Sequence, residues 1–259
     1  METDPSILTC FLSDRVFVLG PSHVTYLQGC ALSPFEKFAT PLGDLHVDEG
    51  AVQQLRSTKM FAMMSEEVDE AEHSIEMHLP YIYKVWGERD VKIVPVLVGH
   101  LPEQMNFAYA LCFAQYFADP RTLFVISSDF CHWGSRFQYT WYQPTSTSKG
   151  IMLSSANKSC IEPKMPIYQS IQNLDAEGMS AISFNKHGSR RARQAFAMHL
   201  TKTGNTICGR NPILLMLTIL EILEDRGAMF ECRFTHYKVR SFSHEVMHPQ
   251  AHIYLLILS

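Results

Sequence analysis

The chain has 259 residues, of which 46% are hydrophobic and 19% are charged, and this is sufficient for a sizeable core. A formal net charge of -4 and a sequence pI near 6.3 provide no positive field for nucleic acid, which we exclude as a partner. No segment reaches the roughly 18 apolar residues that a membrane-spanning helix needs. We therefore expect an ordinary soluble globular protein.

The cysteines and the first residues predict a reducing compartment. Seven cysteines, an odd number, are scattered without CxxC pairs, and this favours reduced thiols over a disulfide framework. The start lacks the basic stretch and apolar run of a signal peptide. We expect a cytoplasmic protein in which a functional cysteine would be a metal ligand or a reactive thiol.

The first predicted strand covers residues 15–20 and ends in a tight turn that exposes His23. A neutral imidazole is a common metal ligand and proton carrier. His23 is therefore a candidate ligand, with an ordinary turn residue as the alternative.

Residues 35–47 are rich in turn formers, and residues 48–64 have the spacing of a short surface helix. Residues 66–86 predict a longer helix, kinked at Pro80. Its apolar stripe, which would pack on a sheet, consists of Ile75, Leu79, Ile82 and Trp86.

His73 and Glu76 are three residues apart and would share a face of this helix. Such a pair can bridge a metal or orient one another. The alternative is a solvated acidic helix start whose carboxylates complement the helix dipole.

Further strands and a helix follow in alternation. Residues 91–99 predict a strand at an edge or bulge because of Pro95, residues 105–118 a helix, and residues 123–126 a central strand. Strand–helix–strand repetition implies right-handed crossovers. We therefore predict an α/β fold with a largely parallel sheet flanked by helices on both faces.

The central strand delivers Asp129 and His132 into a turn that Trp133 and Gly134 close. In open α/β sheets, ligands bind beyond the carboxyl ends of parallel strands. An acid and a histidine three residues apart at this point predict a catalytic pair. The alternative is that both side chains merely hydrogen-bond the turn.

Arg136, Phe137, Tyr139, Trp141 and Tyr142 follow this turn and predict an aromatic and basic rim. Such a rim could hold an aromatic or anionic ligand by stacking and bidentate hydrogen bonds. Arg136, Tyr139 and Trp141 are therefore candidate ligand-binding residues. Hydrophobic cover is the alternative for the same side chains.

Cys208 lies just before a predicted helix in which Asn211 is the N-cap and Pro212 the first helical position. The helix dipole and Arg210 would favour a thiolate, the form that binds metals. An inert buried cysteine remains the alternative.

The other segments complete the predicted domain. Residues 143–166 lack periodicity and predict a flexible surface insertion, and residues 168–200 carry helical patterns. Residues 229–239 and 252–258 predict two strands that complete the sheet. We expect residues 1–259 to form a single domain.

Five motifs along the chain, in order and in approximate spacing, resemble the Memo family, named for a mediator of receptor-driven cell motility. The resemblance covers roughly residues 15–245. The motifs are GPSHV at residues 20–24, EHSIEMHLPY at 72–81, IVPVLVG at 93–99, LFVISSDFCHWG at 123–134 and NTICGR at 205–210.

The resemblance implies an α/β fold similar to the class III extradiol dioxygenases, with a pocket once suited to non-haem iron. Memo-like proteins hold iron or copper with two histidines and a cysteine. The second of these histidines falls on His23 and the cysteine on Cys208. Asp129 and His132 fall where the pocket carries its acid and its dioxygenase-like base.

The chain also departs from the family pattern. The turn that contributes the first metal histidine, a PHAGY-like sequence, has no counterpart before Arg15. Two protein ligands bind a divalent ion more weakly than three, and a missing strand exposes a sheet edge. We expect a shortened form of the domain with a vestigial metal pocket.

The resemblance implies a signalling adaptor that acts downstream of receptor tyrosine kinases in cell motility and cytoskeletal regulation. Its expected partners are phosphotyrosine peptides of these receptors, received at the Arg136 rim, and regulators of actin and microtubules. We expect it in the cytoplasm and also in the nucleus.

The alternative is an iron- or copper-dependent redox protein. His132 would move protons, and Cys208 would replace the carboxylate of a 2-His-1-carboxylate site. The Cys208 thiolate in place of a carboxylate and the absence of the family's first metal histidine both weigh against the ring-cleaving reaction of the dioxygenases. We therefore favour the signalling adaptor.

Overall fold

The structure is a computed structural model that describes residues 13–87, 89–145, 147–240 and 250–258. It consists of two compact units. Unit 1 comprises residues 1–128, 209–230 and 258–259, and unit 2 comprises residues 129–208 and 231–257. The single-domain organisation therefore stays a prediction.

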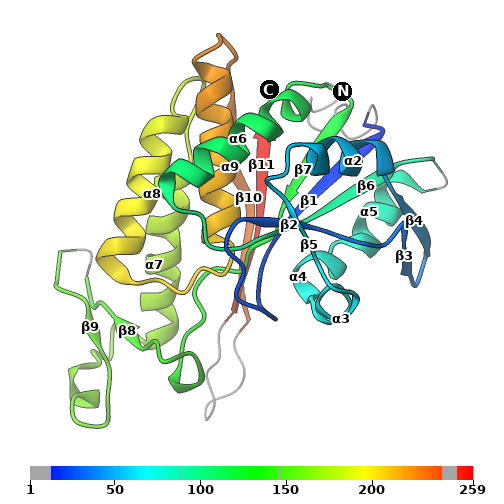
Figure 1. The fold of residues 1–259 in the computed structure, drawn as a ribbon. Coiled ribbons are helices and arrows are strands. Elements are labelled where there is room, and N and C mark those ends of the chain that lie inside the picture. Colours follow the sequence, from blue (N-terminus) through cyan, green and yellow to red (C-terminus); the bar gives the residue numbers. More distant parts are fainter. Residues whose placement is uncertain (1–12, 88, 146, 241–249, 259) are drawn as a thin grey trace, which may run out of the picture. The chain divides into compact units, whose positions relative to one another are not determined.

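Unit 1 contains a seven-stranded mixed sheet (Figure 1). Strands β4, β6, β1 and β7 lie side by side and pair in parallel, which confirms the predicted α/β class. Strand β3 pairs antiparallel with β4, and β2 pairs antiparallel with the end of β6 and in parallel with β5. The strands are β1 (Arg15–Pro21), β2 (Cys30–Leu32), β3 (Lys37–Thr40), β4 (Gly43–Val47), β5 (Ala62–Met63), β6 (Lys92–Val98) and β7 (Thr122–Ile126).

Helices cover both faces of strand β1. The ring of Phe17 packs edge-on against Phe113 of α6, whereas a Cβ added at Gly20 would collide with Ser74 of α4. Positions 17 and 20 point to opposite faces because side chains alternate along a strand. The helices of unit 1 are α2 (Glu49–Ser57), α3 (Glu66–Ala71), α4 (His73–Glu76), α5 (Leu79–Trp86), α6 (Glu103–Phe117) and α9 (Arg210–Glu224).

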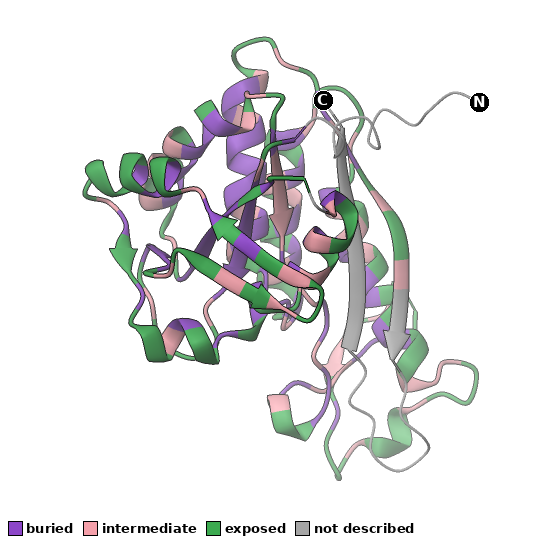
Figure 2. Cartoon of the chain, turned by 90° about the vertical axis from the view of Figure 1, so that its right-hand side faces the viewer, coloured by how far each residue is buried: buried purple, intermediate pink, exposed green. Residues whose placement is uncertain are grey.

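The central strands carry the core of unit 1. Phe17, Leu19, Ile93 and Leu97 are all 0% exposed. Figure 2 colours the described residues of the chain by their burial. Complete burial of such a side chain is worth about 1.5–3 kcal/mol. Strands buried on both faces read as continuous apolar runs, and this explains why β1 and β6 could be predicted as strands. Their expected places in the sheet are wrong: β6 pairs with β4 and β1 and is no edge strand, whereas β7, expected to be central, pairs only with β1 among the described strands.

The predicted helix over residues 66–86 is wrong, because the structure has three short helices there. Glu72 leaves the helical conformation, with ψ 115°, and its carboxylate accepts a hydrogen bond from the backbone N–H of Ser74. Pro80 lies in the first turn of α5, where its missing N–H costs no hydrogen bond. It therefore helps to start a helix instead of kinking one.

Two other expectations in unit 1 need correction. The turn-rich residues 35–47 form the β3–β4 hairpin, in which Thr40 Oγ1 donates to Gly43 O. The helix expected over residues 48–64 ends at Ser57 and is followed by strand β5. Strand β4 also pairs with β6, and β5 pairs with β2, and local periodicity does not report such long-range pairing.

Unit 2 is built on helices α7 and α8, which pack against each other. Strands β10 and β11 pair with each other in a separate two-stranded sheet, so the prediction that they complete the central sheet is wrong. The elements are η1 (Ser135–Phe137), β8 (Trp141–Tyr142), β9 (Ile151–Met152), η2 (Lys158–Cys160), α7 (Ile167–Ile182), α8 (Ser189–Thr203), β10 (Glu231–Arg240) and β11 (Gln250–Leu258).

The segment 143–166 is not wholly irregular. It contributes strand β9, which pairs with β8, and the 3-10 helix η2. Its flexibility stays a prediction. None of the helices in the described part of the chain combines the length and hydropathy needed to cross a bilayer.

Candidate functional site

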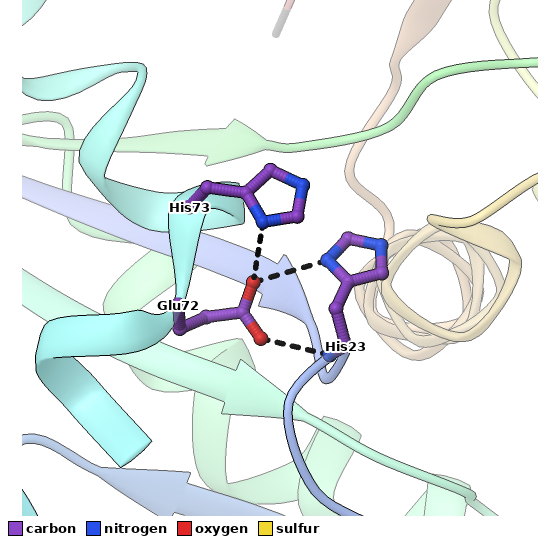
Figure 3. Close-up of side chains that lie close together, drawn as sticks. All are labelled: His23, Glu72 and His73. Carbon is purple, nitrogen blue, oxygen red and sulfur yellow. Dashed lines mark hydrogen bonds and ion pairs between the residues drawn. The ribbon is translucent and has the colours of Figure 1, made fainter. Parts of the chain in front are cut away.

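His23 lies two residues beyond the end of strand β1, as predicted for a turn residue at the carboxyl end of a strand. Its ring stacks on the ring of His73, with centroids 4.6 Å apart and planes 16° from parallel. The two side chains are 31% and 59% exposed. Two imidazoles from distant parts of the chain therefore lie face to face in unit 1 (Figure 3).

The carboxylate of Glu72 joins these two histidines, although its side chain is fully buried. Glu72 Oε1 lies 3.0 Å from His23 Nδ1 and 3.7 Å from His73 Nδ1. Its Oε2 accepts a hydrogen bond of 2.8 Å from the backbone N–H of His23. We call these three residues the His23–Glu72–His73 cluster.

Glu72 is ionised at neutral pH. Burial alone would raise the pKa of its carboxyl group, but hydrogen bonds from the side chain and backbone of His23 and from the backbone of Ser74 lower it to about 2. The cluster therefore holds a buried negative charge beside two imidazoles.

The sequence prediction paired His73 with the wrong carboxylate. Glu76 is exposed, whereas Glu72 is the N-cap of α4 and turns inward to His23. The sequence does contain a signal for the inward position of Glu72. It lies two residues before Ser74, where a carboxylate can accept a hydrogen bond from a backbone N–H at the start of a helix. Helical periodicity concealed it because all three positions were assigned to one helix.

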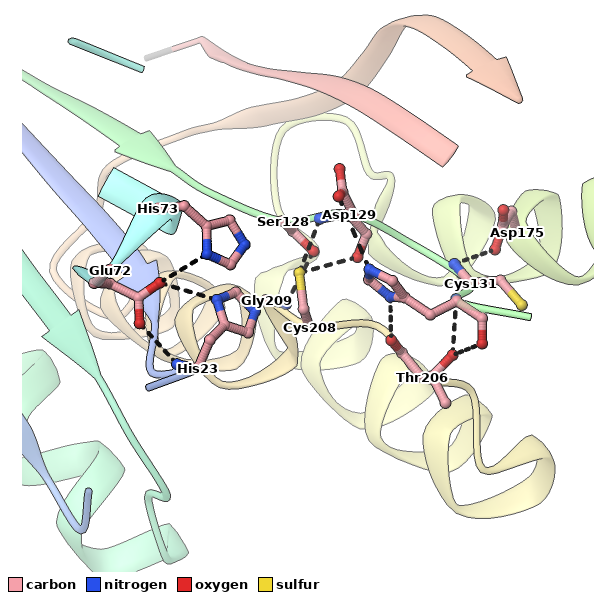
Figure 4. A network of polar contacts seen from close by, with 11 residues as sticks. His23, Glu72, His73, Ser128, Asp129, Cys131, Asp175, Thr206, Cys208 and Gly209 are labelled. Atoms are coloured by element: carbon pink, nitrogen blue, oxygen red, sulfur yellow. Dashed lines mark hydrogen bonds and ion pairs between the residues drawn. The ribbon is translucent and has the colours of Figure 1, made fainter. Parts of the chain in front are cut away.

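Asp129 and Cys208 meet in unit 2 through the backbone of each residue and the sulfur of Cys208 (Figure 4). The backbone N–H of Asp129 donates to Cys208 Sγ at 3.0 Å, and the backbone N–H of Cys208 donates to Asp129 O at 3.2 Å. Cys208 is half-buried, and its sulfur also lies 3.5 Å from Asp129 O, to which a thiol can donate. Imidazole and thiolate donors both suit iron and copper, so the residue types of His23 and Cys208 fit the expected metal.

His132 is held by Thr206 in the same unit. Its Nδ1 lies 3.0 Å from the Thr206 carbonyl oxygen, and its backbone N–H donates to Thr206 Oγ1 at 2.8 Å. Because a carbonyl oxygen only accepts, Nδ1 carries the hydrogen and Nε2 of the neutral ring can accept a proton. Nε2 is 3.9 Å from Asp129 Oδ2, so the predicted acid and base do lie together.

The buried Asp175 was missed by the sequence reasoning. Its Oδ1 accepts from the backbone N–H of Cys131 at 3.1 Å, and its Oδ2 accepts from the Tyr237 hydroxyl at 2.9 Å. Burial raises the pKa of Asp175 to about 7, although hydrogen bonds from Cys131, Tyr237 and Asn205 oppose the change. It lies on helix α7, where a lone aspartate carries no recognisable motif.

The predicted rim around Arg136 is only partly exposed. Arg136 is exposed, with Cζ 5.8 Å from the centroid of the Phe137 ring. Tyr139 is 3% exposed and its hydroxyl donates to Thr203 O, so the prediction that it faces a ligand is wrong. Trp141 is half-buried against the apolar cluster that contains Tyr142. For Tyr139 and Trp141, the hydrophobic-cover alternative describes the structure.

A cavity of about 780 Å³ in unit 2 is lined by residues of α7 and by the start of the 143–166 segment. Its lining includes Gln143, Asn173 and Glu177 but none of the predicted site residues. The predicted site residues therefore do not line this cavity. Of the predicted residues, the structure brings together Asp129, His132 and Cys208 in unit 2, and the grouping of His23 with Cys208 stays a prediction.

The fold and these clusters define an α/β protein whose histidine, carboxylate and thiol groups lie just beyond the ends of β1 and β7 and at the starts of α4 and α9. The family model described as "Memo-like protein" matches residues 9–250. The chain therefore belongs to the Memo-like protein family, which confirms the resemblance seen in the five motifs.

Individual relatives agree with this assignment. "Protein memo-1 homolog" of Caenorhabditis elegans is 47% identical over 233 residues, which cover 88% of this chain and 60% of the relative. "Protein MEMO1" of Xenopus laevis is 43% identical, and that of Homo sapiens 40%, each over 91% of this chain and 70% of the relative. The chain thus spans about six to seven tenths of the length of these relatives.

Proposed function

We propose that this chain is a signalling adaptor that acts downstream of receptor tyrosine kinases in cell motility and cytoskeletal regulation. Membership of the Memo-like family supports this proposal. The proposed partners are phosphotyrosine segments of these receptors and regulators of actin and microtubules. The proposed locations are the cytoplasm and the nucleus.

The exposed position of Arg136 is the observation on which the adaptor proposal rests. Its side chain is exposed at the 3-10 helix η1, and it makes no ion pair with a carboxylate of the described residues. A guanidinium that stacks on an aromatic ring keeps its N–H donors available for a phosphate. Arginine of this kind is the usual recognition element for phosphorylated peptides.

Substitution Arg136→Ala should weaken the binding of a phosphotyrosine peptide at least about tenfold, since a bidentate charge-assisted contact is worth more than about 1.4 kcal/mol. Fluorescence anisotropy with labelled phosphorylated and unphosphorylated peptides measures the effect. Arg191→Ala, on α8 of the same unit, removes the same charge from another exposed position and should retain the affinity. Equal affinity for both peptides would contradict the proposal.

A metal-dependent redox function is the second candidate, and the proximity of Asp129, His132 and Cys208 favours it. An iron or copper ion would supply the chemistry with oxygen. The neutral His132 would accept a proton at Nε2 while Thr206 holds the ring by Nδ1.

Under this second candidate, the protein supplied with ferrous iron should consume oxygen faster than the same iron alone, as recorded with an oxygen electrode. His132→Gln should then reduce the excess rate about 100-fold, because general base catalysis typically contributes at least this factor. An excess rate that is absent, or that His132→Gln does not change, would exclude the redox function.

A further inference from the structure

We propose that the cavity of about 780 Å³ in unit 2 binds a small organic amine, whose protonated nitrogen contacts Glu177 and whose apolar part fills the space between α7 and Met165. This site goes beyond the proposed adaptor function and does not depend on Arg136. Its lining belongs to unit 2 and includes none of the candidate metal ligands or predicted catalytic residues.

One face of helix α7 forms a wall of the cavity. The lining residues of this helix follow one another at intervals of three or one, as on a single helical face, and are Asn173, Ala176, Glu177, Ser180 and Ala181. Residues 143–145, which follow β8, and Met165 complete the lining. Asn173 Nδ2 lies 3.7 Å from Met165 Sδ, so the two parts of the lining contact each other. The volume is in the usual range for a small-molecule site.

The charge of the lining selects a cation. Among the described residues that line the cavity, Glu177 alone has a charged side chain. A carboxylate accepts hydrogen bonds and repels another anion, so the lining disfavours carboxylate and phosphate ligands. The Glu177 side chain is 34% exposed, and partial shielding from water strengthens its attraction for a positive charge.

The neighbours of Glu177 on α7 suit a primary ammonium group. Asn173 lies four positions before it and Ser180 three positions after it, so both flank the carboxylate on the same helical face. The amide oxygen of Asn173 and the hydroxyl of Ser180 can accept further hydrogen bonds from the three N–H donors of a primary ammonium. Ala176 and Ala181 occupy little space beside these groups and leave room for the apolar part of the ligand.

Lys202 of α8 already makes the contact that the ligand nitrogen would make. Its Nζ lies 3.6 Å from Glu177 Oε2, and its side chain is 60% exposed. An ion pair this exposed contributes little to stability. A ligand ammonium can therefore displace the lysine, which turns towards solvent. Lys202 competes with the ligand under this proposal, whereas it would attract an anionic ligand.

Three indole compounds that differ only in their head group provide the test. Tryptamine carries an ammonium, tryptophol a hydroxyl and indole-3-propionate a carboxylate on the same two-carbon arm. Isothermal titration calorimetry with the whole chain should show that tryptamine binds at least about tenfold more tightly than tryptophol, because a charge-assisted hydrogen bond replaces a neutral one. Indole-3-propionate should bind most weakly.

Variants of the lining locate the binding. Glu177→Gln should reduce the affinity for tryptamine to about that for tryptophol, and Lys202→Met should raise it about two- to fivefold by removing the competitor. Ala176→Phe fills the cavity and should weaken binding at least about tenfold. The matched controls are Glu162→Gln, an exposed carboxylate outside the lining, and Ala197→Phe at an exposed position of α8, and both should retain the affinity.

Three outcomes would overturn the proposal. These are no binding of tryptamine, equal affinities for tryptamine and tryptophol, and a loss of affinity in Lys202→Met, which would show that the lysine itself holds the ligand. Lys202 is largely exposed, so its variant decides the matter even if Glu177→Gln does not fold. Phosphopeptide binding by the same samples reports separately on the adaptor function.

Discussion

Gly209→Ala should destabilise the protein by about 3 kcal/mol, the upper end of the cost of adding atoms to a filled space. A Cβ at this position would overlap Ser128 Cβ and lie 2.5 Å from Ser127 O. The neighbouring backbone resists a shift because the Ser127 N–H donates to Leu19 O at 2.9 Å. At about 2–4 °C per kcal/mol, Tm should fall by roughly 6–12 °C.

Gly50→Ala is the matched control for this substitution. Gly50 lies inside α2, and its added Cβ would meet only Asp48 Oδ1, at 3.4 Å. Alanine is a better helix former than glycine by about 1 kcal/mol, so this variant should be as stable as the wild type or slightly more stable. Urea unfolding measures both. A Gly209→Ala protein with the midpoint of the wild type would show that the backbone around Ser127 can move.

Asp175→Asn should remove a large part of the pH dependence of stability. The folded pKa of Asp175 is about 7, whereas an unfolded aspartate has a pKa of about 3.9. A raised pKa means that the neutral form stabilises the fold below the unfolded pKa and that this contribution is lost as pH rises through about 7. The loss between pH 4 and pH 8 should be roughly 4 kcal/mol at this one residue.

Asparagine keeps an oxygen acceptor for the Cys131 N–H but carries no charge. The free energy of unfolding of Asp175→Asn, relative to the wild type, should therefore rise from pH 4 to pH 8. Ser170→Ala is the control, because Ser170 is buried and neutral on the same helix and its loss should cost the same at both pH values. Parallel pH profiles for the wild type and Asp175→Asn would contradict the assignment.

The predicted strands and the closeness of Asp129 to His132 show what local pattern can report. Residues 15–20 and 123–126 are apolar runs, and both are strands of the central sheet. Asp129 and His132 follow the second run directly, so their closeness required only three residues of chain. Motifs of this length also sufficed to predict the family.

Pairing across long stretches of chain lay beyond such patterns. Period-two alternation predicts that a segment is a strand but does not specify its partner, and so β10 and β11 were assigned to the wrong sheet. The sequence likewise does not reveal that Tyr139 is buried. Its burial depends on contacts with residues distant in the chain, such as Thr203.

The sequence by itself determined the α/β class, the family and the strand ends at which His23, Asp129 and His132 lie, because each follows from a short continuous run of residues. Only the tertiary structure decided that Glu72 meets His23, since 49 positions separate them. It also decided that Asp175 is buried. Both carboxylates owe their charge state to groups from other elements, and hydrogen bonding and desolvation of this kind arise only when the chain has folded.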